Sequence, residues 1–177
     1  MTLSTSTSLP PLFPVRLRDL SCELRSCDAL EEPVVRGEFT ITAASIIHPD
    51  TAVGYRIEAG DQVVAYLPDH EPALSPAFPR LRPWTSGAAV ASGADLLIHD
   101  AQYGPDEYQE HVPWGHSSVT DAVAFADLVG ARTLALFHHD PSHDDEAVEC
   151  LVREARAASR GVQVVAARQG ATLTLGQ

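Results

Sequence analysis

Four short apolar runs in this 177-residue sequence each end in a histidine or an aspartate. The polar residues that follow these strand-like runs are His48, Asp69, the pair His99 and Asp100, and the pair His138 and His139. Strands of a layered α/β fold end at a shared edge, so these groups can converge on one place. Imidazole and carboxylate together suit Zn²⁺, Mn²⁺ or iron. Polar residues also end strands where strands reach the surface, but four such endings favour a site.

The first half of the chain has the pattern of antiparallel strands. A strand is predicted over 38–47, and a hairpin is predicted with strands at 54–58 and 63–67. Five prolines between residues 68 and 86 predict a long surface loop. The Ser-, Thr- and Pro-rich residues 1–13 are expected to form a flexible tail.

The second half alternates between strand and helix patterns. One helix is predicted to begin at Ser118 and end at Gly130, and another to begin at Ser142 and end at Gly161. Buried strands are predicted at 94–98 and 133–137, and two further strands at 162–167 and 171–175. Hairpin strands followed by this alternation indicate an α/β layered fold.

The charge of the chain restricts its partners. Twenty-four acidic residues oppose 12 basic ones, and the formal net charge is −12. All 12 basic residues are arginines. Such a chain is poorly suited to long nucleic acid, whose binding rests on neutralising phosphates, although a metal ion can supply positive charge locally for a small phosphoester. No apolar run reaches the roughly 18 residues of a membrane span. We expect no membrane partner, and three cysteines without a Cys-x-x-Cys pair favour the cytoplasm.

Four segments resemble, in the same order, the C-terminal half of metallo-β-lactamase-fold hydrolases. They are HPDTAVGYRIEAGDQVVAYLPDHE, GADLLIHDAQYGPDEY, WGHSS and LALFHHDP. The likeness is greatest to the branch of ribonuclease Z and the cyclic-nucleotide phosphodiesterases. It implies that residues 14–177 are the βα half of that family's αββα sandwich.

The resemblance also implies roles for particular residues. His48 looks like a histidine ligand of the first metal, and His138 looks like the last histidine ligand of the second. Asp69 looks like the aspartate that bridges both ions. His116 matches a histidine beside the substrate phosphate, and Asp100 holds an acidic position suited to orient that histidine.

The family's His-x-His-x-Asp-His signature, which normally supplies most metal ligands, does not occur in this sequence. We therefore expect up to two ions, Zn²⁺ or Mn²⁺ or iron, in a completed site, and weak or partial binding by this chain alone. The missing half normally covers one face of the sheet, so that face is expected to be apolar and uncovered. An N-terminal half or a second copy of the chain is the expected partner.

Two functions follow from these expectations. The first is metal-dependent hydrolysis of a small phosphodiester, with His116 steadying the phosphate or the leaving oxygen. The alternative is a non-catalytic remnant, or one part of a split or dimeric assembly that acts as an interaction module.

Several other side chains carry simpler expectations. His70 and His111 are expected at the surface, and Cys150 is expected in the core of the last long helix. Trp84 and Trp114 could stack on a nucleobase, but partial burial beside a loop is the favoured interpretation.

Overall fold

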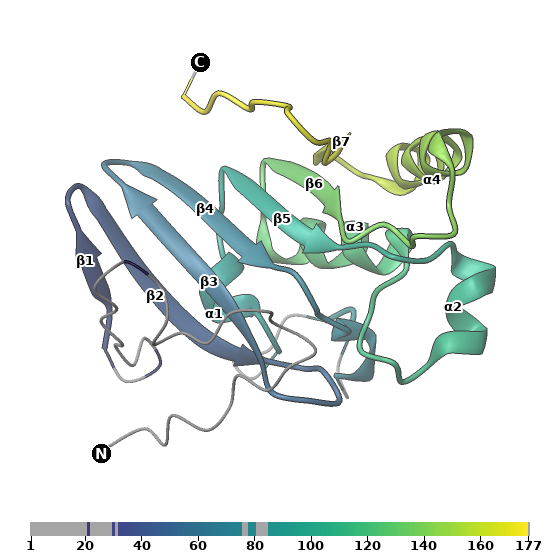
Figure 1. The fold of residues 1–177 in the computed structure, drawn as a ribbon, viewed down its shortest axis with the longest axis horizontal. Coiled ribbons are helices and arrows are strands. Elements are labelled where there is room, and N and C mark those ends of the chain that lie inside the picture. The colour runs from purple at the N-terminus through teal and green to yellow at the C-terminus, as the bar shows by residue number, and fades with distance from the viewer. Residues whose placement is uncertain (1–20, 22–29, 31, 76–77, 81–84, 177) are drawn as a thin grey trace.

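Seven strands form one mixed sheet in the computed structural model, which describes residues 21, 30, 32–75, 78–80 and 85–176 (Figure 1). The strands are β1 (Val34–Arg36), β2 (Phe39–Ile46), β3 (Ala52–Ala59), β4 (Gln62–Leu67), β5 (Leu96–Asp100), β6 (Thr133–Phe137) and β7 (Gln163–Ala166). The helices are the 3-10 helix η2 (Pro72–Leu74), α1 (Ala88–Ala91), α2 (Pro105–His111), α3 (Val119–Val129) and α4 (Asp145–Ala158). The expected flexible tail at 1–13 lies outside the described residues, and the 68–86 loop is described in part.

The sheet changes character at β4. Strands β1 to β4 pair antiparallel, and β4 to β7 pair parallel. The expected hairpin is confirmed, with Tyr55 opposite Tyr66, and so is the α/β class. Because β4, β5 and β6 run in the same direction, their carboxyl ends lie at one edge of the sheet. The groups that follow these strands therefore share that edge.

The helix caps explain why the predicted start of one helix is right and that of another is wrong. Helix α3 begins as predicted, because the Ser118 hydroxyl accepts a hydrogen bond from the Asp121 N–H (3.0 Å), and it ends at left-handed Gly130. Helix α4 begins at Asp145, later than predicted. The carboxylate of Asp140 accepts from the Ser142 N–H (2.8 Å), which holds Ser142 in a turn and leaves Asp144 as the cap.

Two other predictions were wrong. The 171–175 segment is not a strand; it is irregular and mostly exposed, with no partner strand in the described part of the chain. Cys150 is exposed rather than in the core. Helix α4 buries Val152 and Ala155, and a residue two positions before Val152 points away from that buried face.

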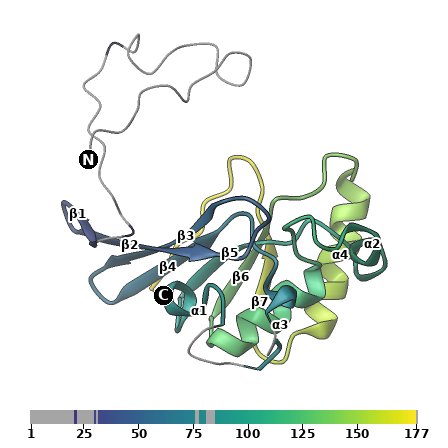
Figure 2. The same cartoon turned by 90° about the horizontal axis from the view of Figure 1, so that it is seen from below.

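One face of the sheet is covered by helices. Figure 2 shows α1 and α3 on this side. Leu67, Leu97 and Leu136 point into this layer, where they belong to the same buried cluster as Phe125 of α3. These side chains are almost inaccessible to solvent, so the helix-covered face holds the core.

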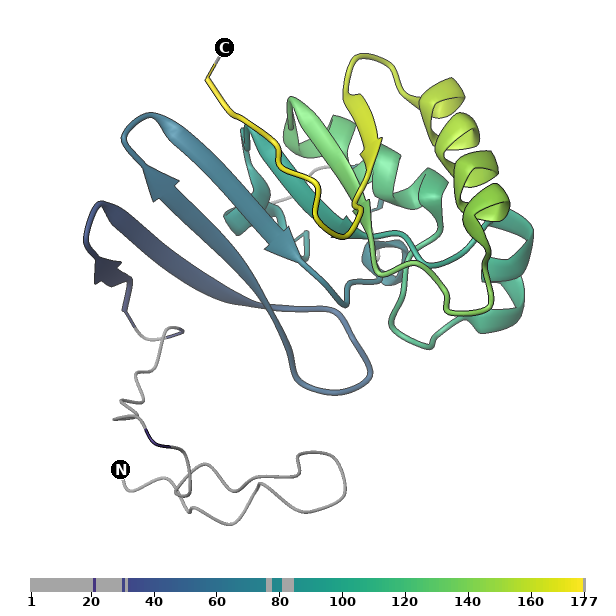
Figure 3. The same cartoon turned by 45° about the horizontal axis from the view of Figure 1, so that its top comes forward.

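The opposite face is also apolar, but no helix of the described residues covers strands β2 to β4 there (Figures 2 and 3). The strand register places Ile41, Ile57 and Val64 side by side on it, with Tyr55 and Tyr66 as neighbours. All five are partly exposed. We call this surface the open face. It matches the expected uncovered face, and an apolar surface of this kind favours association.

The two faces should respond differently to substitution. Leu97→Ala should lower the free energy of unfolding by about 2–5 kcal/mol, because it leaves a cavity in the covered core. Ile57→Thr, on the open face, should cost less than about 1 kcal/mol and reduce self-association. Urea unfolding and light scattering measure the two effects. A monodisperse, thermally stable wild-type monomer would contradict an uncovered apolar face.

Candidate metal centre

Three strand ends and one helix start bring four polar side chains together. Asp69 follows β4, Asp100 is the last residue of β5, and His138 directly follows β6. His116 lies three residues before Val119, the first residue of α3. Each offers a ligand atom, and these atoms all lie within 4.8 Å of one another. The shared strand edge therefore produces a cluster suited to a cation.

The cluster consists of two hydrogen-bonded pairs. His138 Nε2 lies 3.1 Å from Asp69 Oδ1, and His116 Nδ1 lies 2.6 Å from Asp100 Oδ2. The two imidazoles stack with their centroids 4.8 Å apart. The side chains of Asp69 and His138 are 39% and 36% exposed, whereas that of Asp100 is fully buried. The first pair is thus open to a ligand, and the second is anchored in the protein.

Asp100 is committed to hydrogen bonds with the protein. Its Oδ1 accepts from the N–H groups of Gln102 and Ser117, both at 3.2 Å. Its Oδ2 accepts from the His70 N–H (3.3 Å) and from His116. The hydrogen bond to Asp100 raises the pKa of His116, although partial burial opposes this. Asp100 therefore holds His116 with its proton on Nδ1 and leaves Nε2 free.

His48 lies beside the cluster but not in it. Its ring centroid is 5.7 Å from that of His116, and its Nδ1 accepts from the Asp50 N–H (3.2 Å). The ring packs on Gly115, where a Cβ atom would lie 2.2 Å from His48 Cδ2. Gly115 also has φ of +99°, so both space and backbone conformation require glycine there.

A buried carboxylate that the sequence did not reveal connects these segments. Glu71 is fully buried; its Oε2 accepts from the Gly115 N–H (2.7 Å) and its Oε1 from the Tyr108 hydroxyl (2.8 Å). Its own N–H donates to Ile47 O at 3.1 Å. Glu71 thus ties the segment before His48 to the segment before His116. Its only signal was its place two residues after Asp69.

His70, expected at the surface, is fully buried. Its partner His99 donates Nδ1–H to the Asp100 carbonyl (2.6 Å), so His99 Nε2 accepts from His70 Nδ1–H at 2.8 Å. His70 Nε2 then accepts from the Ser86 hydroxyl (3.0 Å). The Asp100 carbonyl can only accept a hydrogen bond, so it places the His99 proton on Nδ1, and this in turn places the His70 proton on Nδ1. Burial lowers the pKa of both histidines. His111 is half-buried instead of exposed, because its ring stacks on Tyr103.

The donor set fits a metal ion. Histidine nitrogen and aspartate oxygen are ligands of Zn²⁺, Mn²⁺ and iron alike. Asp69 and His138 present these atoms at an exposed edge, and His138 Nδ1 is buried with no hydrogen-bond partner in the described structure. In the described part of the chain, His138 is the ion-pair partner of the Asp69 carboxylate, and a bound cation would neutralise that carboxylate further.

The backbone of His138 is strained. Among the described residues it is the one non-glycine with positive φ, at 60°. A side chain with a Cβ atom is disfavoured in this left-handed conformation by about 1–2 kcal/mol. Such strain persists where the surroundings determine the position of a residue, and it is common at functional sites.

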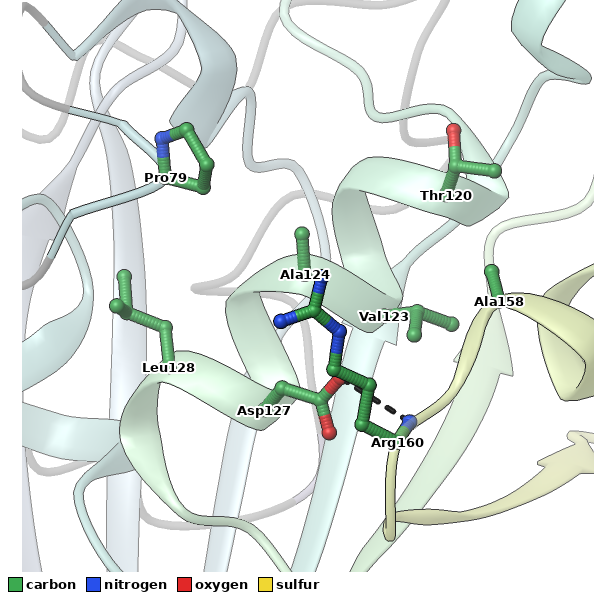
Figure 4. A pocket seen from close by; sticks show the side chains of 8 residues that line it. All are labelled: Pro79, Thr120, Val123, Ala124, Asp127, Leu128, Ala158 and Arg160. Atoms are coloured by element: carbon green, nitrogen blue, oxygen red, sulfur yellow. Dashed lines mark hydrogen bonds between the residues drawn. The ribbon is translucent and has the colours of Figure 1, made fainter.

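A hollow of about 350 Å³ lies beside α3, and Figure 4 shows the side chains that line it. Its wall includes Val123 and Leu128, and the Asp127 carboxylate accepts from the Arg160 N–H at 3.4 Å. None of the residues predicted to form the site lines it. The hollow is therefore separate from the candidate metal centre.

Among the described residues, no helix is both long and apolar enough to span a membrane.

The strain at His138 can be measured with paired substitutions. His138→Gly and His138→Ala both remove the imidazole, but only glycine relieves the left-handed backbone. We expect the glycine variant to be more stable by roughly 1 kcal/mol in urea unfolding. At His143, whose φ is not positive, alanine should be the more stable replacement. The same order at both positions would contradict the strain.

The pKa of His116 should lie above the usual histidine value of 6.5, and the pKa of His70 should lie below it. In the metal-free chain at pH 6.5, NMR titration of the imidazole Cε1–H signals should show His116 mostly charged and His70 neutral. The unfolded chain binds protons to His70 and His99 below pH 6.5 whereas the folded chain resists, so this pair lowers the free energy of unfolding as pH falls. His116 acts oppositely: its stabilisation is full below pH 6.5 and is lost as pH rises through its raised pKa. A His70 signal that titrates above pH 6.5 would exclude the neutral buried pair.

Comparison with known proteins agrees with this architecture. The family described as a β-lactamase superfamily domain matches residues 5–139. Ribonuclease Z of Haloarcula marismortui is 29% identical over 90% of this chain and 61% of its own length. The probable metallo-hydrolase YhfI of Bacillus subtilis is 30% identical over 65% of this chain and 43% of its own length. The chain thus spans about half the length of these relatives.

Solved structures share the fold. The crystal structure of the metallo-β-lactamase fold protein YhfI from Bacillus subtilis has a TM-score of 0.59 and 26% identity, over 78% of this chain and 50% of that one. Human tRNase Z, short form, has a TM-score of 0.58 and 19% identity, over 81% and 46%, a likeness of fold alone. The fold expected from the sequence is confirmed. The chain therefore belongs to the β-lactamase superfamily, the family of metallo-β-lactamase-fold hydrolases.

Proposed function

We propose that this chain carries one half of a metal-dependent centre that hydrolyses a small phosphodiester. The observation that carries the proposal is the convergence of Asp69, Asp100, His116 and His138 at one sheet edge. Asp69 and His138 hold the metal ion, and His48 completes the ligands that this chain supplies. The ion is Zn²⁺, Mn²⁺ or iron. When bound, it supplies positive charge that polarises the phosphoryl group.

His116 acts as the general acid in this proposal. Because Asp100 accepts its Nδ1–H, Nε2 is the nitrogen that faces the substrate. The hydrogen bond to Asp100 raises the pKa of His116 and so favours the protonated ring, whose Nε2–H can donate its proton to the leaving oxygen. The N–H groups of Ser117 and Val119 already donate to protein oxygens. The phosphate is therefore held chiefly by the metal ion and by His116.

The substrate we propose is small. The net charge of −12, with arginine as the only basic side chain, leaves little to neutralise a long phosphate backbone. Relatives named ribonuclease Z run against this expectation. A direct comparison of RNA with a small phosphodiester in the completed enzyme decides between them.

The alternative function is an interaction module within a split or dimeric assembly in the cytoplasm. The open face and the half-length match to relatives favour this second candidate. In this case an N-terminal half or a second copy covers the open face, whether or not the assembly is catalytic. Hydrolysis by the completed assembly, lost on substitution of His116, distinguishes the enzyme from the module.

Metal binding tests the ligand assignment in the chain alone. We expect weak, substoichiometric Zn²⁺ binding by calorimetry, because most of the family's ligands are absent. Asp69→Ala and His138→Ala should weaken it at least tenfold, since each removes a direct ligand. His143→Ala is the matched control: this histidine pairs with Glu107 at 2.9 Å outside the cluster, and its loss should leave Zn²⁺ affinity unchanged. Two tightly held ions per chain would contradict the proposed half-site.

The rate of hydrolysis and the metal content together distinguish His116, the proposed general acid, from the proposed metal ligands. With an N-terminal half bearing the family signature supplied, His116→Ala should reduce hydrolysis of bis-p-nitrophenyl phosphate by roughly 10²–10⁴-fold. Its metal content, measured by elemental analysis, should stay intact. If His116→Ala removes metal as His138→Ala does, the two histidines are wrongly assigned.

A further inference from the structure

A row of aromatic rings leads from the metal centre to the surface. Tyr103 lies edge-on to His116, with centroids 6.3 Å apart, and stacks on His111 at 4.3 Å. His111 contacts Trp114 edge-on at 4.8 Å. Tyr103 is 4% exposed, but Trp114 is 60% exposed. The partial burial expected for Trp114 is therefore wrong, and the row ends in an open indole.

Hydrogen bonds hold the backbone that carries Trp114. The backbone N–H of Trp114 donates to His111 O at 2.7 Å, and His111 Nδ1–H donates to Glu107 O at 2.6 Å. On the other side, Gly115 is held by the buried carboxylate of Glu71. The segment that presents the indole is thus fixed to α2 and to the site. An aromatic side chain has few rotatable bonds, so it loses little conformational entropy when a flat ligand binds it.

Trp114 lies close to His116, the proposed general acid. It is two residues from His116, so their Cα atoms are at most about 7 Å apart. A phosphoester whose phosphate lies at His116 can therefore place an attached group beside the indole. Every nucleobase has a flat face that stacks on tryptophan, and stacking needs no basic side chain. This suits a chain with a net charge of −12.

We propose that Trp114 is a stacking platform for the base of a nucleoside phosphoester whose phosphate occupies the metal centre. This inference rests on the proposed function and narrows its substrate class. His111 contacts the indole edge-on, and Tyr103 connects His111 to His116. Trp114 determines which phosphoesters bind well and does not itself take part in bond cleavage.

Calorimetry on the chain in a large excess of Zn²⁺, which compensates for its weak metal binding, tests the platform with three probes: adenosine 5′-monophosphate, ribose 5-phosphate and adenosine. The monophosphate should bind roughly 5- to 150-fold more tightly than ribose 5-phosphate, the range expected for one stacked base. Trp114→Leu should remove this difference, and Trp114→Phe should retain most of it. Val112→Ala is the matched control, because Val112 is an exposed apolar residue of the same loop (42%) and should leave the difference intact.

Fluorescence adds a direct readout. Trp84 and Trp114 are the two tryptophans of the sequence, so Trp84→Phe leaves Trp114 as the sole indole. The monophosphate and adenosine should quench its emission, and ribose 5-phosphate should not. Equal affinity of the monophosphate and ribose 5-phosphate for the wild-type chain would overturn the platform. If adenosine binds and quenches as well as its monophosphate does, and ribose 5-phosphate does not bind, the platform stands and the proposed phosphoesterase site fails. If none of the three binds, both fail.

Discussion

The buried carboxylate of Asp100 organises the functional edge of this molecule. Its four hydrogen bonds come from the segment after β4, the segment after β5 and the segment before α3. A buried carboxylate without such donors would cost several kcal/mol, so these three segments must meet where Asp100 lies. Asp69 and His116 are carried on two of them. The position of the candidate metal centre therefore follows from the need to satisfy one charge.

The parts of this arrangement that local sequence determines could be predicted. The 54–67 hairpin and the Ser118 cap of α3 depend on residues close together in the chain. The strand endings at Asp69 and His138 are also local signals, and parallel pairing of β4 to β6 turns them into neighbours. Asp100 is also a strand ending; the resemblance added His116 and implied that Asp100 orients it, and the structure pairs the two at 2.6 Å.

What the sequence could not reveal depends on distant partners. Glu71 meets Gly115 across 44 residues, and His70 meets His99 across 29. Nothing in the neighbourhood of either residue marks it as buried, because burial of a polar group becomes acceptable only once its partners arrive. The sequence predicts Ser142 as a helix cap, but serine is equally common in the turn that Ser142 forms with Asp140, and local sequence does not distinguish the two.

Gly115 limits which substitutions the loop before α3 can accept during evolution. Any larger residue there would collide with His48, and φ of +99° disfavours every side chain. Position 115, between Trp114 and His116, is therefore closed to larger side chains, while the Trp114 side chain faces solvent. In the proposed stacking role, single substitutions at Trp114 would change substrate preference and leave the backbone at His116 in place. The glycine separates a part of the loop that is free to evolve from a part that is not.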